Sequence, residues 1–216
     1  MKPRVLVILS GCGFLDGSEI HEAVLCLLYL DQEGAAVTCA APDKPQMHVV
    51  DHLLQTPVAG QRNVLVESAR IARGRIVALE TVKPLDFDVV VLPGGYGAAK
   101  NLSNVATDGP NASVEPDVAR ILRAFRAANK PICAVCISPA VVVAALREGE
   151  VTIGNDTGTA GAILAMGGTH RDCTVDTICV DQARKLVTAP AYMYDAGIAQ
   201  VATGVQAAIR ETLRLI

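Results

Sequence analysis

The sequence predicts an α/β protein with a doubly wound, mostly parallel sheet, helices on both faces and a small antiparallel hairpin near its end. Two observations carry this prediction. The apolar runs 4–9, 87–92 and 131–135 have the length and composition of strands that are buried on both faces. Each run ends in a turn that leads toward a helical pattern, which is typical of parallel strands. With 216 residues and no long polar linker, the chain fits a single domain spanning 1–216.

The composition narrows the classes of function. Aromatic residues make up only 3% of the chain, and the net charge is −3. Both values argue against a nucleic-acid partner, which requires stacking residues or a basic surface. No apolar run approaches the ~18 residues that span a membrane. The seven cysteines have irregular spacing, which indicates reduced thiols. We therefore expect a protein of a reducing compartment, and we take this to be the cytoplasm.

The elements between these strands follow in order. Asp16 to Glu19 fit a capping box, with Asp16 as the N-cap, that opens a helix ending at Gly34. The remaining predicted elements are a strand over 35–41, a helix over 64–72, a strand over 76–79, a helix through 118–125, a helix through 141–146, a short strand at 151–153, a helix over 159–166, a hairpin formed by 177–181 and 185–188, and a final helix over 194–216.

Cys136 stands where a buried strand turns sharply into a helix. The apolar run 131–135 precedes it, and Ser138 and Pro139 are good residues for the first turn of a helix. A side chain at such a turn projects above the edge of the sheet, near the unpaired N–H groups of the helix. These groups favour an anion, so the pattern predicts a lowered pKa for the thiol and a cysteine nucleophile. The alternative is a buried cysteine that only fills space.

A thiol nucleophile also needs a proton acceptor and an oxyanion site. The first helix offers Glu19 and Glu22, and Glu22 is the freer of the two because Glu19 is assigned to the capping box. The alternative for Glu22 is a solvated position on the helix. Gly94 and Gly95 follow a buried strand, where their backbone can approach a ligand closely. The N–H groups of Gly95 and Ile137 are the predicted oxyanion donors.

The other cysteines and histidines give weaker candidates. Cys12 follows the first strand, and we expect it to lie close enough to Cys136 for the two thiols to meet. Cys133 forms a Cys-x-x-Cys pattern with Cys136, but it falls inside the buried strand and faces the other side of the sheet, which disfavours a redox pair. The cysteines and histidines show no spacing that is typical of a zinc site, so no metal is expected.

Several motifs resemble those of a known family, nearly end to end. They are Val7 to Gly13, Asp16 to Val24, Ala41 to Lys44, Asn63 to Leu65, Pro93 to Gly95, Gly97 to Asn104, Cys136 to Ile137 and Thr188 to Met193. In these motifs the chain is similar to the ElbB-like proteins, which are also called isoprenoid biosynthesis glyoxalases. They belong to the PfpI-like branch of the class I glutamine amidotransferase-like proteins. The resemblance implies their flavodoxin-like fold, and we expect a homodimer.

The resemblance also implies roles for individual residues. It makes Cys136 the elbow cysteine, Glu22 the first-helix glutamate and the Gly95 N–H an oxyanion donor. The chain departs from protease-like and amidotransferase members at Ile137, where those proteins carry a histidine. Peptidase or glutaminase activity is therefore not expected. His170 is the remaining histidine that we consider able to reach the site.

The function implied is that of a glutathione-independent glyoxalase, which converts methylglyoxal or glyoxal into lactate or glycolate. The small 2-oxoaldehyde would bind covalently to Cys136 as a hemithioacetal, and Glu22 would move the proton, without a metal or an organic cofactor. The alternative is a redox sensor or a scaffold homodimer whose Cys136 is reactive but not catalytic.

Overall fold

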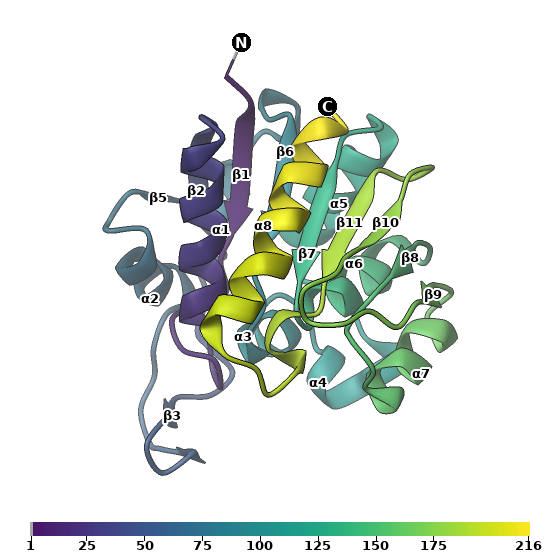
Figure 1. Ribbon diagram of the computed structural model, residues 1–216. Coiled ribbons are helices and arrows are strands. Elements are labelled where there is room, and N and C mark those ends of the chain that lie inside the picture. Colours follow the sequence, from purple (N-terminus) through teal and green to yellow (C-terminus); the bar gives the residue numbers. More distant parts are fainter. Residues whose placement is uncertain (1) are drawn as a thin grey trace.

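The computed structural model describes residues 2–216 and is organised around one central sheet (Figure 1). From one edge to the other its seven strands are β10 (Cys179–Asp181), β11 (Leu186–Ala189), β7 (Ile132–Val135), β6 (Val89–Leu92), β1 (Arg4–Ile8), β2 (Ala36–Ala41) and β5 (Ile76–Ala78). All neighbouring strands run parallel except β10 and β11. This confirms the predicted fold class. The predicted hairpin is formed by β10 and β11, and it extends one edge of the sheet.

Helices cover both faces of the sheet (Figure 1). One face carries α1 (Ile20–Gln32), α2 (Val64–Ile71) and α8 (Ile198–Arg214), and the other carries α3 (Tyr96–Lys100), α5 (Pro116–Ala127) and α6 (Ser138–Leu146). Along β1, Val5 and Val7 pack with the helices of the first face, whereas Leu6 and Ile8 pack with those of the second. This alternation follows from the two-residue repeat of a strand, and it explains why the central strands are apolar throughout.

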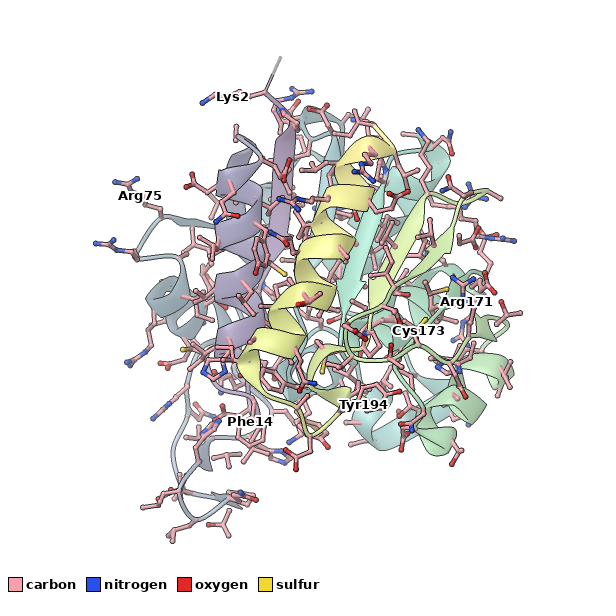
Figure 2. The ribbon with its side chains drawn as sticks, viewed as in Figure 1. Lys2, Phe14, Arg75, Arg171, Cys173 and Tyr194 are labelled. Atoms are coloured by element: carbon pink, nitrogen blue, oxygen red, sulfur yellow. The ribbon has the colours of Figure 1, made fainter. Side chains whose placement is uncertain are left out.

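Smaller elements surround this core. They are the strand pairs β3 (Val50–Asp51) with β4 (Thr56–Pro57) and β8 (Glu150–Val151) with β9 (Thr169–His170), the helices α4 (Val105–Asp108) and α7 (Thr157–Ala165), and the 3-10 turns η1 (Leu79–Thr81), η2 (Pro84–Asp86), η3 (Gly109–Asn111) and η4 (Ala191–Met193). Both termini lie at the edge of the sheet where β1 begins (Figure 1). Phe14 and Tyr194 lie at the opposite edge, where the parallel strands end (Figure 2). The loops that follow these strands therefore meet at one edge.

The start of α1 differs from the prediction. The helix begins at Ile20, and its N-cap is Glu19, whose Oε2 accepts a hydrogen bond of 2.6 Å from the N–H of Glu22. Asp16 is buried outside the helix, where its Oδ2 accepts a hydrogen bond of 2.8 Å from the N–H of Val50. The predicted capping box is therefore wrong, because a carboxylate that binds a distant loop is not available to cap the helix.

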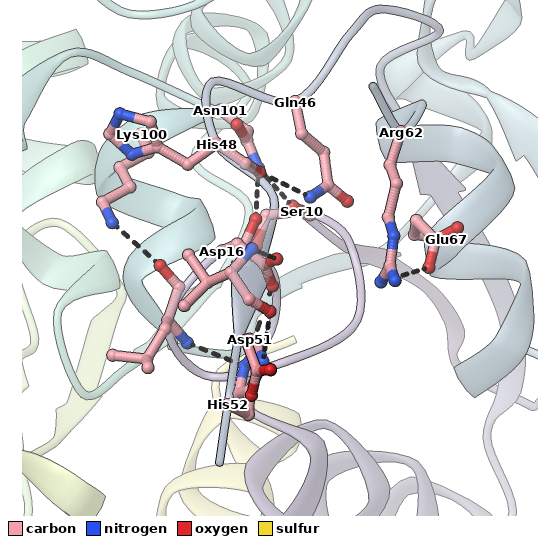
Figure 3. A network of polar contacts seen from close by, with 12 residues as sticks. Ser10, Asp16, Gln46, His48, Asp51, His52, Arg62, Glu67, Lys100 and Asn101 are labelled. Carbon is pink, nitrogen blue, oxygen red and sulfur yellow. Dashed lines mark hydrogen bonds and ion pairs between the residues drawn. The ribbon is translucent and has the colours of Figure 1, made fainter. Parts of the chain in front are cut away.

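Asn101 ties three loops together near the edge where the parallel strands end (Figure 3). Its side chain is 1% exposed, and its Nδ2 donates to the carbonyl oxygens of Ser10 at 2.8 Å and Asp16 at 2.9 Å. Its Oδ1 accepts a hydrogen bond of 3.0 Å from the N–H of Met47. A single amide thus satisfies two buried acceptors and one donor, and it fixes the loop that joins β1 to α1.

We predict that Asn101→Ala lowers the free energy of unfolding by about 2–4 kcal/mol, because three backbone groups lose their partner, two of them in a buried place. Urea unfolding followed by circular dichroism measures this loss. The control is Asn155→Ala at an exposed position, where a change within about 0.5 kcal/mol is expected. Equal destabilisation by the two substitutions would contradict the assigned role.

Candidate active site

Cys136 lies in the turn between β7 and α6, as the sequence predicted. Its φ of 61° places it in the left-handed region, which is costly for a residue other than glycine. The N–H of Cys136 donates to the carbonyl oxygen of Ala189 at 2.9 Å, and the hydroxyl of Ser138 donates to that of Pro93 at 2.6 Å. These bonds to the neighbouring strand ends hold the strained turn in place. A strained cysteine at a strand-to-helix turn is typical of a nucleophile elbow.

Glu22 faces Cys136 from α1 and is fully buried. Its Oε2 accepts a hydrogen bond of 3.0 Å from the N–H of Gly94, and its Oε1 accepts one of 3.1 Å from the N–H of Tyr192. The carboxyl group also shares a hydrogen bond with the Cys136 thiol. A Cβ at position 94 would overlap with both Cys136 and Glu22, so this close approach requires glycine. Glu22 is therefore not the solvated helix residue of the alternative interpretation.

Burial changes the protonation of this pair. Desolvation raises the pKa of Glu22 to about 8, although the N–H groups of Tyr192 and Gly94 oppose the rise. Desolvation also raises the pKa of Cys136, and the nearby Glu22 charge raises it further. The predicted lowering of the thiol pKa is therefore wrong. The helix N-terminus does favour a thiolate, but burial beside a carboxylate outweighs it. At neutral pH the thiol and the carboxyl group each hold a proton.

The backbone N–H groups near Cys136 have two different partners. The N–H groups of Gly95 and Ile137 hydrogen-bond the Cys136 sulfur and oppose the rise of its pKa. The N–H of Gly94 is occupied by Glu22 and is not free for a substrate. Gly95 has a φ of 96°, and a Cβ there would overlap with the backbone of Gly17 and Glu19. Two donors thus converge on the point where a bond to sulfur would form.

The thiol opens onto a cavity of about 350 Å³. Besides Cys136, Ile137 and Gly95, the cavity is lined by the acidic residues Glu19 and Asp156, the aromatic residues Phe14, Tyr96 and Tyr192, and Thr159 and Met193. Glu19 therefore belongs to the site, although its role in the structure is to cap α1. The volume is within the usual range for a small-molecule site.

Tyr192 and His21 form a pair that the sequence analysis did not single out. The Tyr192 hydroxyl and Nδ1 of His21 are 2.9 Å apart. Tyr192 reaches the cavity because Ala191 adopts a φ of 46° and turns the chain after β11. The run from Thr188 to Met193, which contains Tyr192, is one of the motifs that resemble the ElbB-like proteins. Nothing in that run indicates a contact with Glu22, which lies 170 positions away in the sequence.

Two other candidates do not reach the site. Cys12 follows β1, and β6 separates β1 from β7, so the strands of Cys12 and Cys136 are not neighbours. The charges that act most on Cys12 are instead those of Arg70 and Glu67 in α2. His170 lies in β9, where its Nε2 accepts a hydrogen bond of 3.2 Å from the N–H of Ile153 and its side chain is 6% exposed. Neither residue lines the cavity. The structure therefore does not bring Cys12 or His170 to the cavity.

Residues 2–216 contain no group of three or more His, Cys, Asp and Glu side chains that could hold a metal ion. None of the helices within the same residues is both long and apolar enough to cross a bilayer.

The sequence is similar to those of known proteins. A human protein, glutamine amidotransferase-like class 1 domain-containing protein 3, mitochondrial, is 45% identical over 222 residues, which cover 98% of this chain and 83% of that protein. The ES1 protein, mitochondrial, of Danio rerio is 33% identical over 209 residues, which cover 89% of this chain and 77% of that protein.

Solved structures show the same fold. An isoprenoid biosynthesis protein with an amidotransferase-like domain from Ehrlichia chaffeensis has a TM-score of 0.93 and 44% identity, with 99% of each chain covered. Drosophila melanogaster DJ-1beta has a TM-score of 0.59 at 20% identity, covering 100% of this chain and 96% of that chain, which is a likeness of fold alone. The fold is thus that of the class I glutamine amidotransferase-like proteins. The sequence model of the DJ-1/PfpI family matches residues 4–195, and the chain therefore belongs to the DJ-1/PfpI family.

Proposed function

We propose that this protein is a glutathione-independent glyoxalase of the ElbB-like kind, which converts methylglyoxal into lactate or glyoxal into glycolate. The observation that carries the proposal is the buried pair of Cys136 and Glu22 beside a cavity. A thiol and a carboxyl group in contact supply the nucleophile and the proton carrier that an internal redox reaction of a 2-oxoaldehyde requires.

The first step joins the substrate to the enzyme. After the pair has lost one proton, the Cys136 sulfur attacks the aldehyde carbon while Glu22 holds the thiol proton. The aldehyde oxygen becomes an oxyanion, and the N–H groups of Gly95 and Ile137, which point at the sulfur, are placed to stabilise it. The oxyanion then takes the proton from Glu22 and gives a neutral hemithioacetal. Glu22 returns to the carboxylate form that the next step needs.

The second step moves hydrogen between the two carbons. Glu22 removes the proton from the carbon bonded to sulfur, which is acidic because a carbonyl group lies next to it, and an enediolate results. The hydroxyl proton on the sulfur-bearing carbon moves to the negatively charged oxygen of the second carbon. Glu22 then returns the proton to the second carbon, which leaves a thioester on Cys136. Water hydrolyses the thioester to the 2-hydroxy acid and the free thiol. Overall one water molecule is consumed, and neither a metal nor an external oxidant enters the balance.

The alternative of a redox sensor has less support. A sensor cysteine needs thiolate character and, for a disulfide, a nearby second thiol. Burial raises the pKa of Cys136, and β6 separates the strand of Cys12 from that of Cys136. The buried carboxyl partner is better explained by proton transfer.

A homodimer and a cytoplasmic location stay part of the proposal. Ile20, Val24 and Leu28 lie four positions apart on α1 and are 44%, 48% and 43% exposed, which gives one apolar face that supports association of two copies. The seven cysteines are free thiols, which fits a reducing compartment. Sedimentation velocity of the purified protein and fractionation of its native cells test these two expectations; a monomer or a non-cytoplasmic pool would contradict them.

We predict that purified protein forms lactate from methylglyoxal without glutathione, as followed by proton NMR. Cys136→Ser and Glu22→Gln should each lower the rate by more than about 100-fold, because each removes a group that takes part in bond making. Cys173→Ser is the matched control, since Cys173 is partly exposed and does not line the cavity. Lactate no faster than in the buffer blank, or full activity of Cys136→Ser, would refute the proposal.

We further predict that the alkylation of Cys136 by iodoacetamide accelerates about tenfold between pH 7 and pH 9. The pair becomes reactive when it loses one proton, and the pKa of Glu22 is raised to about 8, so the reactive form is scarce below that pH and dominant above it. Mass spectrometry of the peptide that contains Cys136 measures the rate.

In Glu22→Gln the inflection near pH 8 should disappear. The control is Glu33→Gln, at the far end of α1, where Glu33 pairs with Arg210 at 2.8 Å. An inflection near pH 8 that survives in Glu22→Gln would show that another group controls the thiol.

A further inference from the structure

The cavity is larger than the smallest substrates require. Methylglyoxal displaces roughly three or four water molecules, on the order of 100 Å³. The cavity beside Cys136 measures about 350 Å³, so most of it stays unfilled when such a molecule is bound to the sulfur. A substrate that uses the whole site must carry an additional group, and the residues around the remaining space define its chemistry.

These residues carry negative charge and no positive charge. Glu19 and Asp156 line the cavity, and its lining includes no Arg, Lys or His. The N–H of Thr159 donates to Asp156 at 2.7 Å and lowers the pKa of its carboxyl group, so Asp156 is ionised at neutral pH. The charge of Glu19 is felt within the site, since it raises the pKa values of both Glu22 and Tyr192.

His21 and Lys100 are basic residues that contact the lining of the cavity, and both are engaged with other groups. His21 places its Nδ1 2.9 Å from the Tyr192 hydroxyl. Lys100 is the second of these residues. Its Nζ donates to the carbonyl oxygen of Leu15 at 2.8 Å and lies 5.3 Å from the centroid of the Tyr96 ring. It does not line the cavity. An anionic substrate would therefore enter without a partner for its charge, which is costly in a partly enclosed site.

The aromatic residues that line the cavity also favour a positively charged ligand. Phe14, Tyr96 and Tyr192 line the cavity from three different segments. The faces of aromatic rings attract ammonium groups through their quadrupole. The space, the carboxylates and the rings therefore point to one class of ligand.

We propose that the cavity selects carbonyl substrates that carry a positively charged ammonium group, and that Glu19 and Asp156 are the residues that select them. The reaction of such a substrate rests on the proposed function. The selection by charge does not, because it acts on any reagent that approaches Cys136 through the cavity.

Three methanethiosulfonates of similar size test the selection without turnover. The reagents carry a trimethylammonium group, a sulfonate group or neither. Each reacts with the Cys136 thiolate to form a mixed disulfide, while the S–S bond of the reagent breaks and methanesulfinate leaves. Mass spectrometry of the Cys136 peptide gives the three rates, and the neutral reagent corrects for changes in the intrinsic reactivity of the thiol.

We expect the cationic reagent to react at least roughly tenfold faster than the anionic one at low salt, with the ratio falling at high salt. Glu19→Gln with Asp156→Asn should bring the ratio near one. Both amides retain an oxygen that can accept the capping hydrogen bonds from Glu22 and Thr159, so the fold is kept. Glu33→Gln, which removes one negative charge outside the cavity, should leave the ratio unchanged.

Equal rates for the two charged reagents in the wild type, or a ratio that the double substitution does not change, would overturn the proposal. Failure of the glyoxalase reaction is recognised separately. A preserved charge ratio without lactate formation keeps the selection and rejects the reaction, whereas lactate formation with equal rates keeps the reaction and rejects the selection.

Discussion

The contact between the buried carboxyl group of Glu22 and the thiol of Cys136 is the constraint on which the rest of the site depends. A carboxyl group without exposure to water must find donors, and the N–H groups of Gly94 and Tyr192 supply them at 3.0 and 3.1 Å. This explains the glycine at position 94 and the left-handed turn at Ala191, which brings the Tyr192 N–H to the carboxyl group. Three strand ends are thus shaped around one side chain.

This arrangement has a cost in stability with a defined dependence on pH. The pKa of Glu22 is about 8 in the folded protein, against an ordinary value of 4.5. A raised pKa means that the contribution of this group to stability is fully present below about pH 4.5 and is lost as the pH rises through about 8. Each pH unit across that interval corresponds to about 1.4 kcal/mol as an upper limit. Strongly perturbed pKa values of this kind cluster at functional sites, which supports a chemical role for Glu22.

The sequence was sufficient for the fold and for part of the site. The central strands are buried on both faces, so their apolar runs are unambiguous, and the turn at Cys136 follows from the residues on either side of it. The pKa of Cys136 was mispredicted because helix N-termini can be recognised locally, whereas burial depends on α1 and on the turn after β11. We expected Cys12 to lie close to Cys136 for a similar reason. The order of the strands, with β6 between β1 and β7, cannot be recognised from any single segment of the sequence. Asp16 was predicted to cap a helix because its spacing from Glu19 fits a capping box. Its actual partner, the N–H of Val50, lies 34 positions away, and no local pattern indicates it.

The acidic residues that line the cavity also affect the protonation of the pair of Glu22 and Cys136. Desolvation raises the pKa of Glu22, negative charge from Glu19 raises it further, and together they keep the empty site in its unreactive form at neutral pH. A cationic group bound beside Glu19 offsets that charge, because it interacts favourably with the carboxylate form of Glu22 and lowers the pKa of the pair. The bound substrate then promotes the loss of the proton that its own reaction requires. A nucleophile controlled in this way stays protected from stray electrophiles until a ligand of the right charge occupies the cavity.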